Sequence, residues 1–131
     1  MLEINLPDVV AEVTLAFMSY QKALDSDDLE AMEKLFWNSP RTLRYAHNGT
    51  LLGHAAIAGF RRGRKAQGTK AIPRALKNTV ITTFGRDFAV TNTETARAGS
   101  TTVGRQTQAW VRVPEGWRIV TAHVSDQPGT T

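Results

Sequence analysis

Tyr20 is the first residue whose type and position could support chemistry. It recurs with Val13, Phe17 and Leu24 at helical spacings of three and four, so its ring is expected to face the protein core. A buried tyrosine hydroxyl needs a hydrogen-bond partner, because it loses its contacts with water. The spacing leaves two interpretations: a core tyrosine bonded to the backbone, or a phenol that donates a proton to a ligand.

Arg44 is the second such residue. It alternates with Leu43 and Tyr45 in a strand-like run, which places the arginine on the opposite face from those two residues. An arginine inside a cavity is strongly disfavoured unless it is paired, and a carboxylate ligand matches its planar fork. The alternative is a solvated arginine on the outer surface.

His123 and Ser125 are candidates on the final predicted strand. Unbroken alternation puts them on one face with Trp117, Ile119 and Thr121, and we expect that face to line a pocket. The alternative for His123 is a hydrogen-bonded core histidine.

Gln108 is a candidate on the preceding strand, where the register of the last hairpin decides its direction. A two-residue turn at Glu115 and Gly116 and a three-residue turn that adds Pro114 are both compatible with the sequence. The choice moves Gln108, together with Gln106 and Trp110, from one face of the sheet to the other.

Trp37 and Asn38 end the second predicted helix. They are expected near a pocket mouth, where they would close over a ligand, and packing at the core or rim is the alternative for Trp37. His47 and His54 stand in turn and cap contexts, which favour solvent-exposed roles.

The predicted elements that must position these residues are three helices and six strands. The helices are expected at Pro7–Asp25, from a cap at Ser26 or Asp27 to Asn38, and from His54 to about Lys65. A short hairpin lies between the second and third helices. Four strands with short turns then form a meander: Leu76–Phe84, Phe88–Ala96, Thr101–Val113 and Trp117–Val124.

Length and composition limit the function classes. The 131 residues predict a single domain, with its core at about residues 8–125 and a flexible tail at 126–131. No apolar run approaches the roughly 20 residues of a membrane span and no segment resembles a signal peptide, so we expect a cytoplasmic protein with no membrane partner. Zero cysteines and three scattered histidines predict no metal and no cofactor.

The net charge of +4 conceals an asymmetry, because residues 1–36 carry eight carboxylates and only two lysines. The rest of the chain is strongly basic, with an acid-free stretch across the third helix and its loop: Arg61, Arg62, Arg64, Lys65, Lys70, Arg74 and Lys77. This stretch lacks interleaved aromatic residues and any nucleic-acid motif. We therefore expect a small anionic substrate and no nucleic acid as partner.

The order of helices and strands predicts an α+β cone, in which a curved antiparallel sheet and three helices enclose a pocket. This order resembles the NTF2-like (cystatin-like) superfamily. The segments INLPDVVAEV, LFWNSP, TLRY, NTVITTFGRDFA, GRQTQAWVR and GWRIVTAHVS are similar to one branch, the AtzH-like family. The resemblance implies a small decarboxylating amidohydrolase of cyanuric acid breakdown that converts 1,3-dicarboxyurea to allophanate.

The functional tyrosine and arginine of that family fall on Tyr20 and Arg44. The resemblance thus implies that Arg44 holds a substrate carboxylate while Tyr20 donates a proton, directly or through water. Loss of carbon dioxide from an N-carboxylate needs a proton on nitrogen and no metal. The rivals are an isomerase or dehydratase with a carboxylate base, for which Glu94 is the candidate, and a ligand-binding or assembly domain without catalysis.

A homodimer is also expected. The predicted register puts Trp110, Val120, Ala122 and Val124 together on the outer face of the sheet. A monomer would leave this apolar face in water, and large exposed apolar patches mark interfaces.

Overall fold

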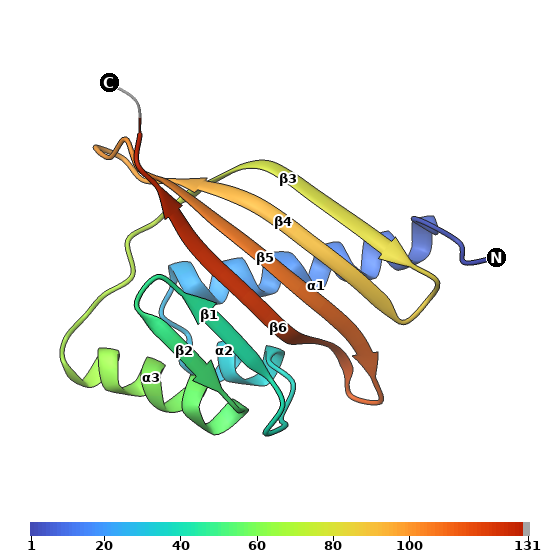
Figure 1. The fold of residues 1–131 in the computed structure, drawn as a ribbon, viewed down its shortest axis with the longest axis horizontal. Helices are drawn as coiled ribbons and strands as arrows, with labels where there is room; N and C mark the ends of the chain where they lie inside the picture. The colour runs from blue at the N-terminus through green and yellow to red at the C-terminus, as the bar shows by residue number, and fades with distance from the viewer. Residues whose placement is uncertain (130–131) are drawn as a thin grey trace.

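The computed structural model describes residues 1–129 and contains three helices and one six-stranded sheet (Figure 1). The helices are α1 (Pro7–Asp25), α2 (Leu29–Leu35) and α3 (His54–Ala66). The strands are β1 (Leu43–Ala46), β2 (Gly49–Leu52), β3 (Ala75–Phe84), β4 (Phe88–Ala96), β5 (Val103–Val113) and β6 (Gly116–Gln127).

The sheet has the order β2-β1-β6-β5-β4-β3. All neighbours are antiparallel except β1 and β6, which run parallel because β1 comes from the hairpin before α3 rather than from the meander. In Figure 1, α1 passes behind the strands, while α2 and α3 lie at the end of the sheet that carries the β1–β2 hairpin. The expected α+β fold is confirmed, with this one parallel pairing.

Helix α1 forms where its apolar spacing predicts it. Pro7 stands in its first turn, where the missing backbone N–H costs nothing, and Lys22 lies in its last turn, where a cation suits the helix dipole. Val9, Val13 and Phe17 are almost fully buried against the inner face of the sheet. One face of this helix therefore supplies a layer of the core.

Helix α2 differs from its prediction at both ends. Its N-cap is Asp28, whose carboxylate accepts a hydrogen bond from the Ala31 N–H, and neither Ser26 nor Asp27 fills that position. The helix ends at Leu35 instead of Asn38, because Phe36 is extended and forms a parallel bridge with Ile119 of β6.

A β-bulge in β6 decides which side chains face inward. Ala109 of β5 pairs with Thr121 and Trp110 pairs with Ile119, so Val120 is an extra residue on β6. Ile119 faces inward before the bulge, and Ala122 faces inward after it, where unbroken alternation would have turned it outward.

The bulge corrects the prediction for His123 and Ser125. Neither residue lines the inner cavity, and His123 is exposed beside Tyr45 of β1, with 5.9 Å between the ring centroids. At the turn, Val113 pairs with Gly116, so Pro114 and Glu115 form the connection, which is neither of the two turns considered.

The end of the molecule around Trp110 is a packed core, called the packed end below. Trp110 is fully buried, and its indole Nε1 donates a hydrogen bond of 2.9 Å to Thr91 Oγ1. Ala89 and Ile119 on the neighbouring strands are equally inaccessible and belong to the same apolar cluster as Phe17 of α1. This end holds the sheet against the helix.

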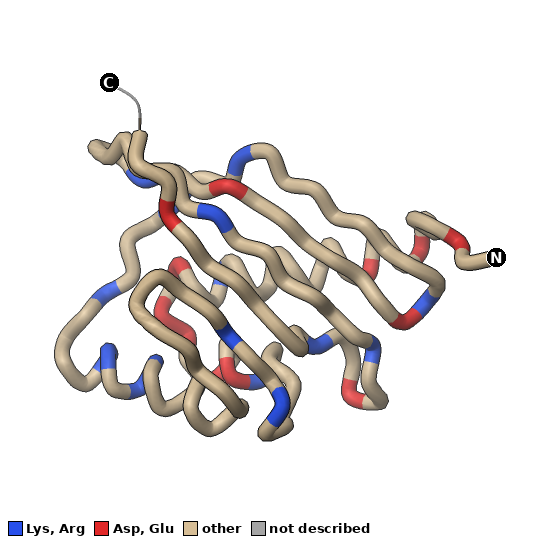
Figure 2. Tube along the Cα trace, in the orientation of Figure 1, with Lys and Arg blue, Asp and Glu red and all other residues tan. Residues whose placement is uncertain are grey.

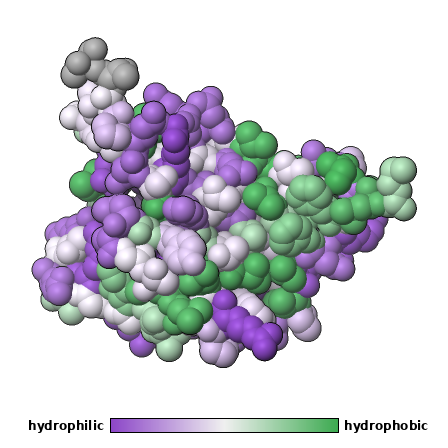
Figure 3. Space-filling view, viewed as in Figure 1, coloured by the Kyte–Doolittle hydropathy of each residue, from purple (hydrophilic) through white to green (hydrophobic). Residues whose placement is uncertain are grey.

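The outer face of the sheet carries exposed apolar side chains, but these are not the residues that the sequence predicted. Trp110 and Ala122, which the prediction assigned to this face, are buried inside, because the bulge and the turn set a different register. Large exposed apolar side chains on the strands are instead Tyr45, Leu52, Val80 and Phe88. Figure 3 shows hydrophobic side chains gathered on this face of the molecule.

The first two residues of the tail expected at 126–131 belong to a strand. Asp126 and Gln127 end β6 and pair with Gly104 and Val103 of β5. Residues 130–131 of that tail lie outside the described residues. Within residues 1–129, no helix is both long and apolar enough to cross a membrane.

Candidate active site

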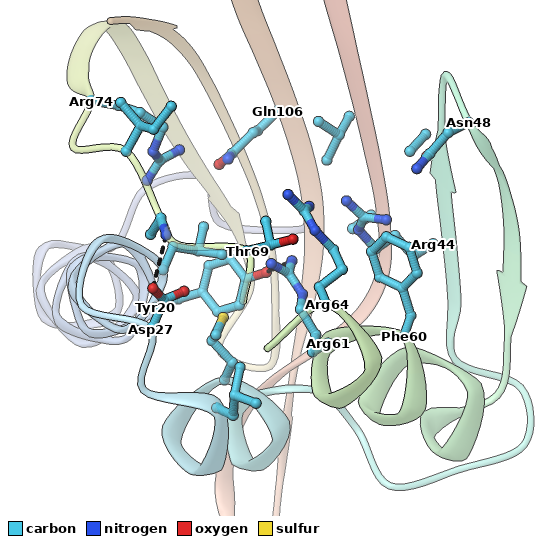
Figure 4. A pocket seen from close by; sticks show the side chains of 18 of the residues that line it. Tyr20, Asp27, Arg44, Asn48, Phe60, Arg61, Arg64, Thr69, Arg74 and Gln106 are labelled. Carbon is cyan, nitrogen blue, oxygen red and sulfur yellow. Dashed lines mark hydrogen bonds between the residues drawn. The ribbon is translucent and has the colours of Figure 1, made fainter. Parts of the chain in front are cut away.

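A cavity of about 340 Å³ lies between the inner face of the sheet, the C-terminal half of α1, and α3 with its following loop (Figure 4). Its principal polar side chains come from four elements, namely α1, β1, α3 and β5: Tyr20, Arg44, Arg61, Arg64, Gln106 and Gln108. Because these elements meet only in the folded protein, the site exists only in the tertiary structure.

Tyr20 joins the packed core to this cavity. The residue is 3% exposed, and its ring meets Phe36 edge-on with 5.6 Å between centroids. Its hydroxyl accepts a hydrogen bond of 3.2 Å from Nη2 of Arg61 instead of bonding to the backbone. The ring therefore packs as a core residue, while the hydroxyl lies among the polar groups of the cavity.

Arg44 enters the cavity from β1. It pairs with Ala122 of β6, and it is 9% exposed. Its guanidinium carbon lies 5.7 Å from the centroid of the Phe60 ring, which is a cation–π distance. Within residues 1–129, no carboxylate forms an ion pair with Arg44. The structure thus holds a nearly buried guanidinium without a counter-ion.

The environment of Arg44 disfavours its positive charge. Burial lowers the pKa of its guanidinium from the ordinary value, and the charges of Arg61 and Arg64 lower that pKa further, while Tyr20 acts in the opposite direction. Arginine nevertheless remains charged at neutral pH. An anion bound beside Arg44 would relieve both the desolvation and the repulsion.

The cavity as a whole is electropositive. Seven cationic side chains line it against two carboxylates, those of Asp27 and Asp126. Figure 2 shows the basic positions along α3 and the loop that follows it. One oxygen of Asp27 already accepts a hydrogen bond of 2.8 Å from the Ala71 N–H. The field at the mouth therefore attracts anions.

Gln108 faces the cavity, and its amide carbonyl accepts a hydrogen bond from a buried side chain. Trp110 Nε1 donates to Thr91 Oγ1, and the Thr91 hydroxyl donates to Oε1 of Gln108 at 3.1 Å. The indole N–H can only donate, so Thr91 Oγ1 accepts that bond, and the hydroxyl hydrogen of Thr91 is used for the bond to Gln108. The Gln108 carbonyl is occupied, and its N–H groups remain to donate to a ligand.

Gln106 is oriented in the same way from the other side. Arg74 Nη2 donates to Oε1 of Gln21 at 2.8 Å, and Gln21 Nε2 donates to Oε1 of Gln106 at 2.9 Å. Since a guanidinium can only donate, both amides of this chain are oriented by it. The wall formed by β5 therefore presents N–H donors, which suit an acceptor-rich ligand.

Other candidates from the sequence lie elsewhere. Trp37 and Asn38 do not line this cavity; they border a separate open hollow together with His54 and Arg118. The reason is that α2 ends at Leu35 and the chain then pairs with β6. There the Trp37 N–H donates a hydrogen bond to the Ile119 carbonyl. The structure thus places these two residues away from the cavity that Tyr20 and Arg44 share.

In the sequence, Arg61 and Arg64 stand out only as parts of a basic stretch. With Ile57 and Phe60 they recur at spacings of three and four, so one face of α3 carries all four residues. That spacing could have separated these inward arginines from Arg62, which is bound to Glu33 on the outside. Within residues 1–129, no three His, Cys, Asp or Glu side chains are grouped to hold a metal ion.

Comparison with known proteins identifies a family and several similar structures. The family model described as AtzH-like matches residues 2–129. A protein of unknown function from the DUF3225 family of Pectobacterium atrosepticum is 50% identical, with 95% of this chain and 94% of that chain covered and a TM-score of 0.87. A cystatin-like fold protein from Burkholderia xenovorans is 42% identical over 99% of this chain and 100% of its own, with a TM-score of 0.88.

More distant structures share the fold alone. An NTF2-like protein of unknown function from Pseudomonas putida is 13% identical over 90% of this chain and 86% of its own, with a TM-score of 0.74. No curated protein matches the sequence. The match across nearly the whole chain and the shared fold lead to one conclusion: this chain belongs to the AtzH-like family, within the NTF2-like superfamily.

Proposed function

We propose that the chain is a cofactor-free decarboxylating amidohydrolase that acts on a small N-carboxylated urea such as 1,3-dicarboxyurea and yields allophanate. The observation that carries the proposal is the Arg44 guanidinium, nearly buried without a counter-ion in the same cavity as the Tyr20 hydroxyl. A substrate carboxylate supplies the missing negative charge. Membership of the AtzH-like family supports the same assignment.

The proposed reaction needs one anchor and one proton. Arg44 binds a carboxylate of the substrate through two parallel N–H donors, and the N–H groups of Gln106 and Gln108 donate hydrogen bonds to the substrate carbonyl oxygen. Tyr20 delivers a proton to the nitrogen of the N-carboxylate, and the carbon–nitrogen bond breaks to release carbon dioxide. The bonding pair stays on nitrogen, so the step needs no electron acceptor, and water returns the proton to Tyr20.

The isomerase or dehydratase alternative finds less support. Its candidate base, Glu94, does not line the cavity; it accepts a hydrogen bond of 2.6 Å from Asn78 and lies 3.7 Å from Arg105. Asp27 lines the cavity but is bonded to the backbone, and Asp126 is exposed at its rim. A catalytic base would need a carboxylate among the buried polar groups.

The test compares wild type with Tyr20→Phe and Arg44→Lys, measuring carbon dioxide and allophanate released from enzymatically generated 1,3-dicarboxyurea. Tyr20→Phe removes only the hydroxyl, so kcat is expected to fall on the order of 10²-fold while the melting curve changes little. Arg44→Lys keeps the charge but loses the fork, so KM is expected to rise more than kcat falls.

Two control variants are matched to these changes. Tyr45→Phe removes a hydroxyl from the neighbouring tyrosine on the outer face, and Arg62→Lys alters an arginine outside the cavity. Both are expected to keep wild-type kinetics. Turnover of Tyr20→Phe at the wild-type rate would show that Tyr20 is a packing residue and that the mechanism is wrong.

A further inference from the structure

Arg61 of α3 makes a hydrogen bond whose direction is fixed by chemistry. A guanidinium has donors and no acceptor, so in its 3.2 Å contact with Tyr20 the phenol oxygen must accept. The Tyr20 proton therefore cannot lie on the line between the two residues. Within residues 1–129, the Tyr20 hydroxyl makes no other hydrogen bond, so its proton is free to point into the cavity.

The same guanidinium carries a donor without a partner. Nε of Arg61 is buried, and within residues 1–129 it makes no hydrogen bond. Buried donors are nearly always satisfied in native proteins, and one that is not calls for an acceptor. Arg61 lines the cavity, so a ligand bound there could supply that acceptor.

The neighbouring Arg62 shows what the guanidinium edge formed by Nε and Nη2 can bind. Arg62 uses Nε and Nη2 together to hold both carboxylate oxygens of Glu33, at 2.7 and 2.8 Å. In Arg61 the corresponding Nη2 holds the Tyr20 oxygen, and Nε stands empty beside it. An acceptor bound to Nε would thus lie next to the Tyr20 oxygen, within hydrogen-bonding distance of its proton.

Arg61 also adds to the uncompensated charge near Arg44. The two guanidiniums repel each other in a largely buried setting, as the lowered pKa of Arg44 reflects. Two such cations favour a ligand with two negative groups over a ligand with one.

We infer that Arg61 is a third functional member of the site: it turns the Tyr20 proton towards the ligand and binds, through Nε, a carboxylate or carbonyl oxygen beside that proton. Arg44 and Arg61 together then select small dicarboxylates. The positioning part rests on the proposed function, whereas the binding part holds whether or not the protein is an enzyme.

The binding experiment is calorimetric titration of the full chain with malonate and with acetate as probes. Wild type is expected to bind malonate about 10-fold more tightly than acetate or better, and Arg61→Met is expected to lose that preference. The matched control is Arg62→Met on the same helix, which also removes one positive charge but leaves the cavity intact; it is expected to behave as wild type.

The kinetic experiment separates positioning from packing. Arg61→Gln retains an N–H that can donate to the Tyr20 oxygen, whereas Arg61→Met retains none. We expect kcat to fall in the order wild type, Arg61→Gln, Arg61→Met, with the two variants about 10-fold apart. Melting curves identify any variant that fails to fold, and Arg61→Lys then replaces it in the malonate titration, where loss of the fork is expected to weaken binding.

The outcomes distinguish this inference from the proposed function. Arg61-dependent malonate binding without any release of carbon dioxide would support the binding site and refute the decarboxylase. Turnover and malonate preference at wild-type levels in a folded Arg61→Met protein would overturn the inference and leave the decarboxylase standing. Equal kcat in Arg61→Gln and Arg61→Met would overturn the positioning role.

Discussion

Strands β5 and β6 pass from a packed end of the molecule to a hollow one, and the inward side chains change on the way. At the packed end, Trp110 and Ile119 are inaccessible to solvent and lie in one apolar cluster. At the hollow end, Gln108 and Ala122 face a cavity that also holds an arginine without a counter-ion. The two ends share one sheet and one helix, α1.

The difference shows how a small domain separates stability from function. At the packed end the indole of Trp110 is hydrogen-bonded to Thr91, and dense packing holds the sheet on α1. At the hollow end, Arg44 is desolvated, and Nε of Arg61 has no hydrogen-bond partner among residues 1–129. Such groups reduce stability in the empty protein and are compensated when an anion binds.

The largest expected effect breaks the packed end. Trp110→Ala removes a fully buried indole and its hydrogen bond to Thr91, so the free energy of unfolding is expected to fall by about 3–5 kcal/mol. Urea unfolding followed by circular dichroism measures this. A variant as stable as wild type would show that the packed end does not supply the stability assigned to it.

The next effect concerns the outer surface of the sheet. We expect a homodimer that covers the exposed apolar residues of this face, which include Val80 and Phe88. Phe88→Asp is expected to weaken the dimer by about 2 kcal/mol or more, since a charge would be buried there. Light scattering at micromolar concentration gives the mass, with Leu15→Asp on exposed α1 surface as control. A monomeric wild type would contradict the expectation.

A smaller expected effect is an increase in stability. Arg44→Met replaces an unpaired, nearly buried cation by an apolar side chain of similar length, so the empty protein is expected to gain about 1 kcal/mol of stability while it loses affinity for carboxylates. Thermal unfolding with and without malonate tests both parts. A less stable variant would mean that the contact with Phe60 outweighs the cost of desolvation.

The cationic side chains at the mouth of the cavity are expected to act on a substrate only through long-range attraction. Arg64, Lys65, Lys70 and Arg97 line the mouth and are exposed, so they attract an anion through a field that salt screens. We expect kcat/KM to fall about 3-fold between about 50 and about 300 mM salt, with kcat unchanged. A change in kcat instead would place salt effects at the chemical step.

Chelation is expected to have no effect. The proposed step uses a phenol and guanidiniums, so turnover should survive dialysis against EDTA. Loss of turnover that added metal restores would contradict the mechanism at the hollow end and leave the packed end untouched.

Much of this molecule follows from local pattern. The apolar spacing of Val9, Val13 and Phe17 predicts α1 with both its ends, and the alternation around Arg44 gives the face of β1 on which the arginine lies. Both follow from periodicity, which the chain carries within a few residues. The fold class and the placement of Tyr20 with its ring inward could therefore be predicted.

The periodicity of neighbouring residues could not predict which side chains meet in the cavity. His123 and Ser125 share the expected face only if β6 alternates without interruption, and the extra residue Val120 breaks that alternation. A bulge depends on how β5 and β6 pair across the sheet, so the sequence of β6 alone does not predict it. The same holds for Arg61, because its contact with Tyr20 joins residues 41 positions apart.

The sequence by itself determined the elements, the α+β class, the excess of positive charge and the inward direction of the Tyr20 ring, and it placed Arg44 opposite Leu43 and Tyr45 without choosing between cavity and solvent. The tertiary structure alone decided which groups surround the ligand space, because that depends on strand register, on the bulge at Val120 and on how α3 lies across the end of the sheet. Periodicity is a local property of the chain, whereas a cavity is made of side chains from distant segments whose mutual distances only packing sets.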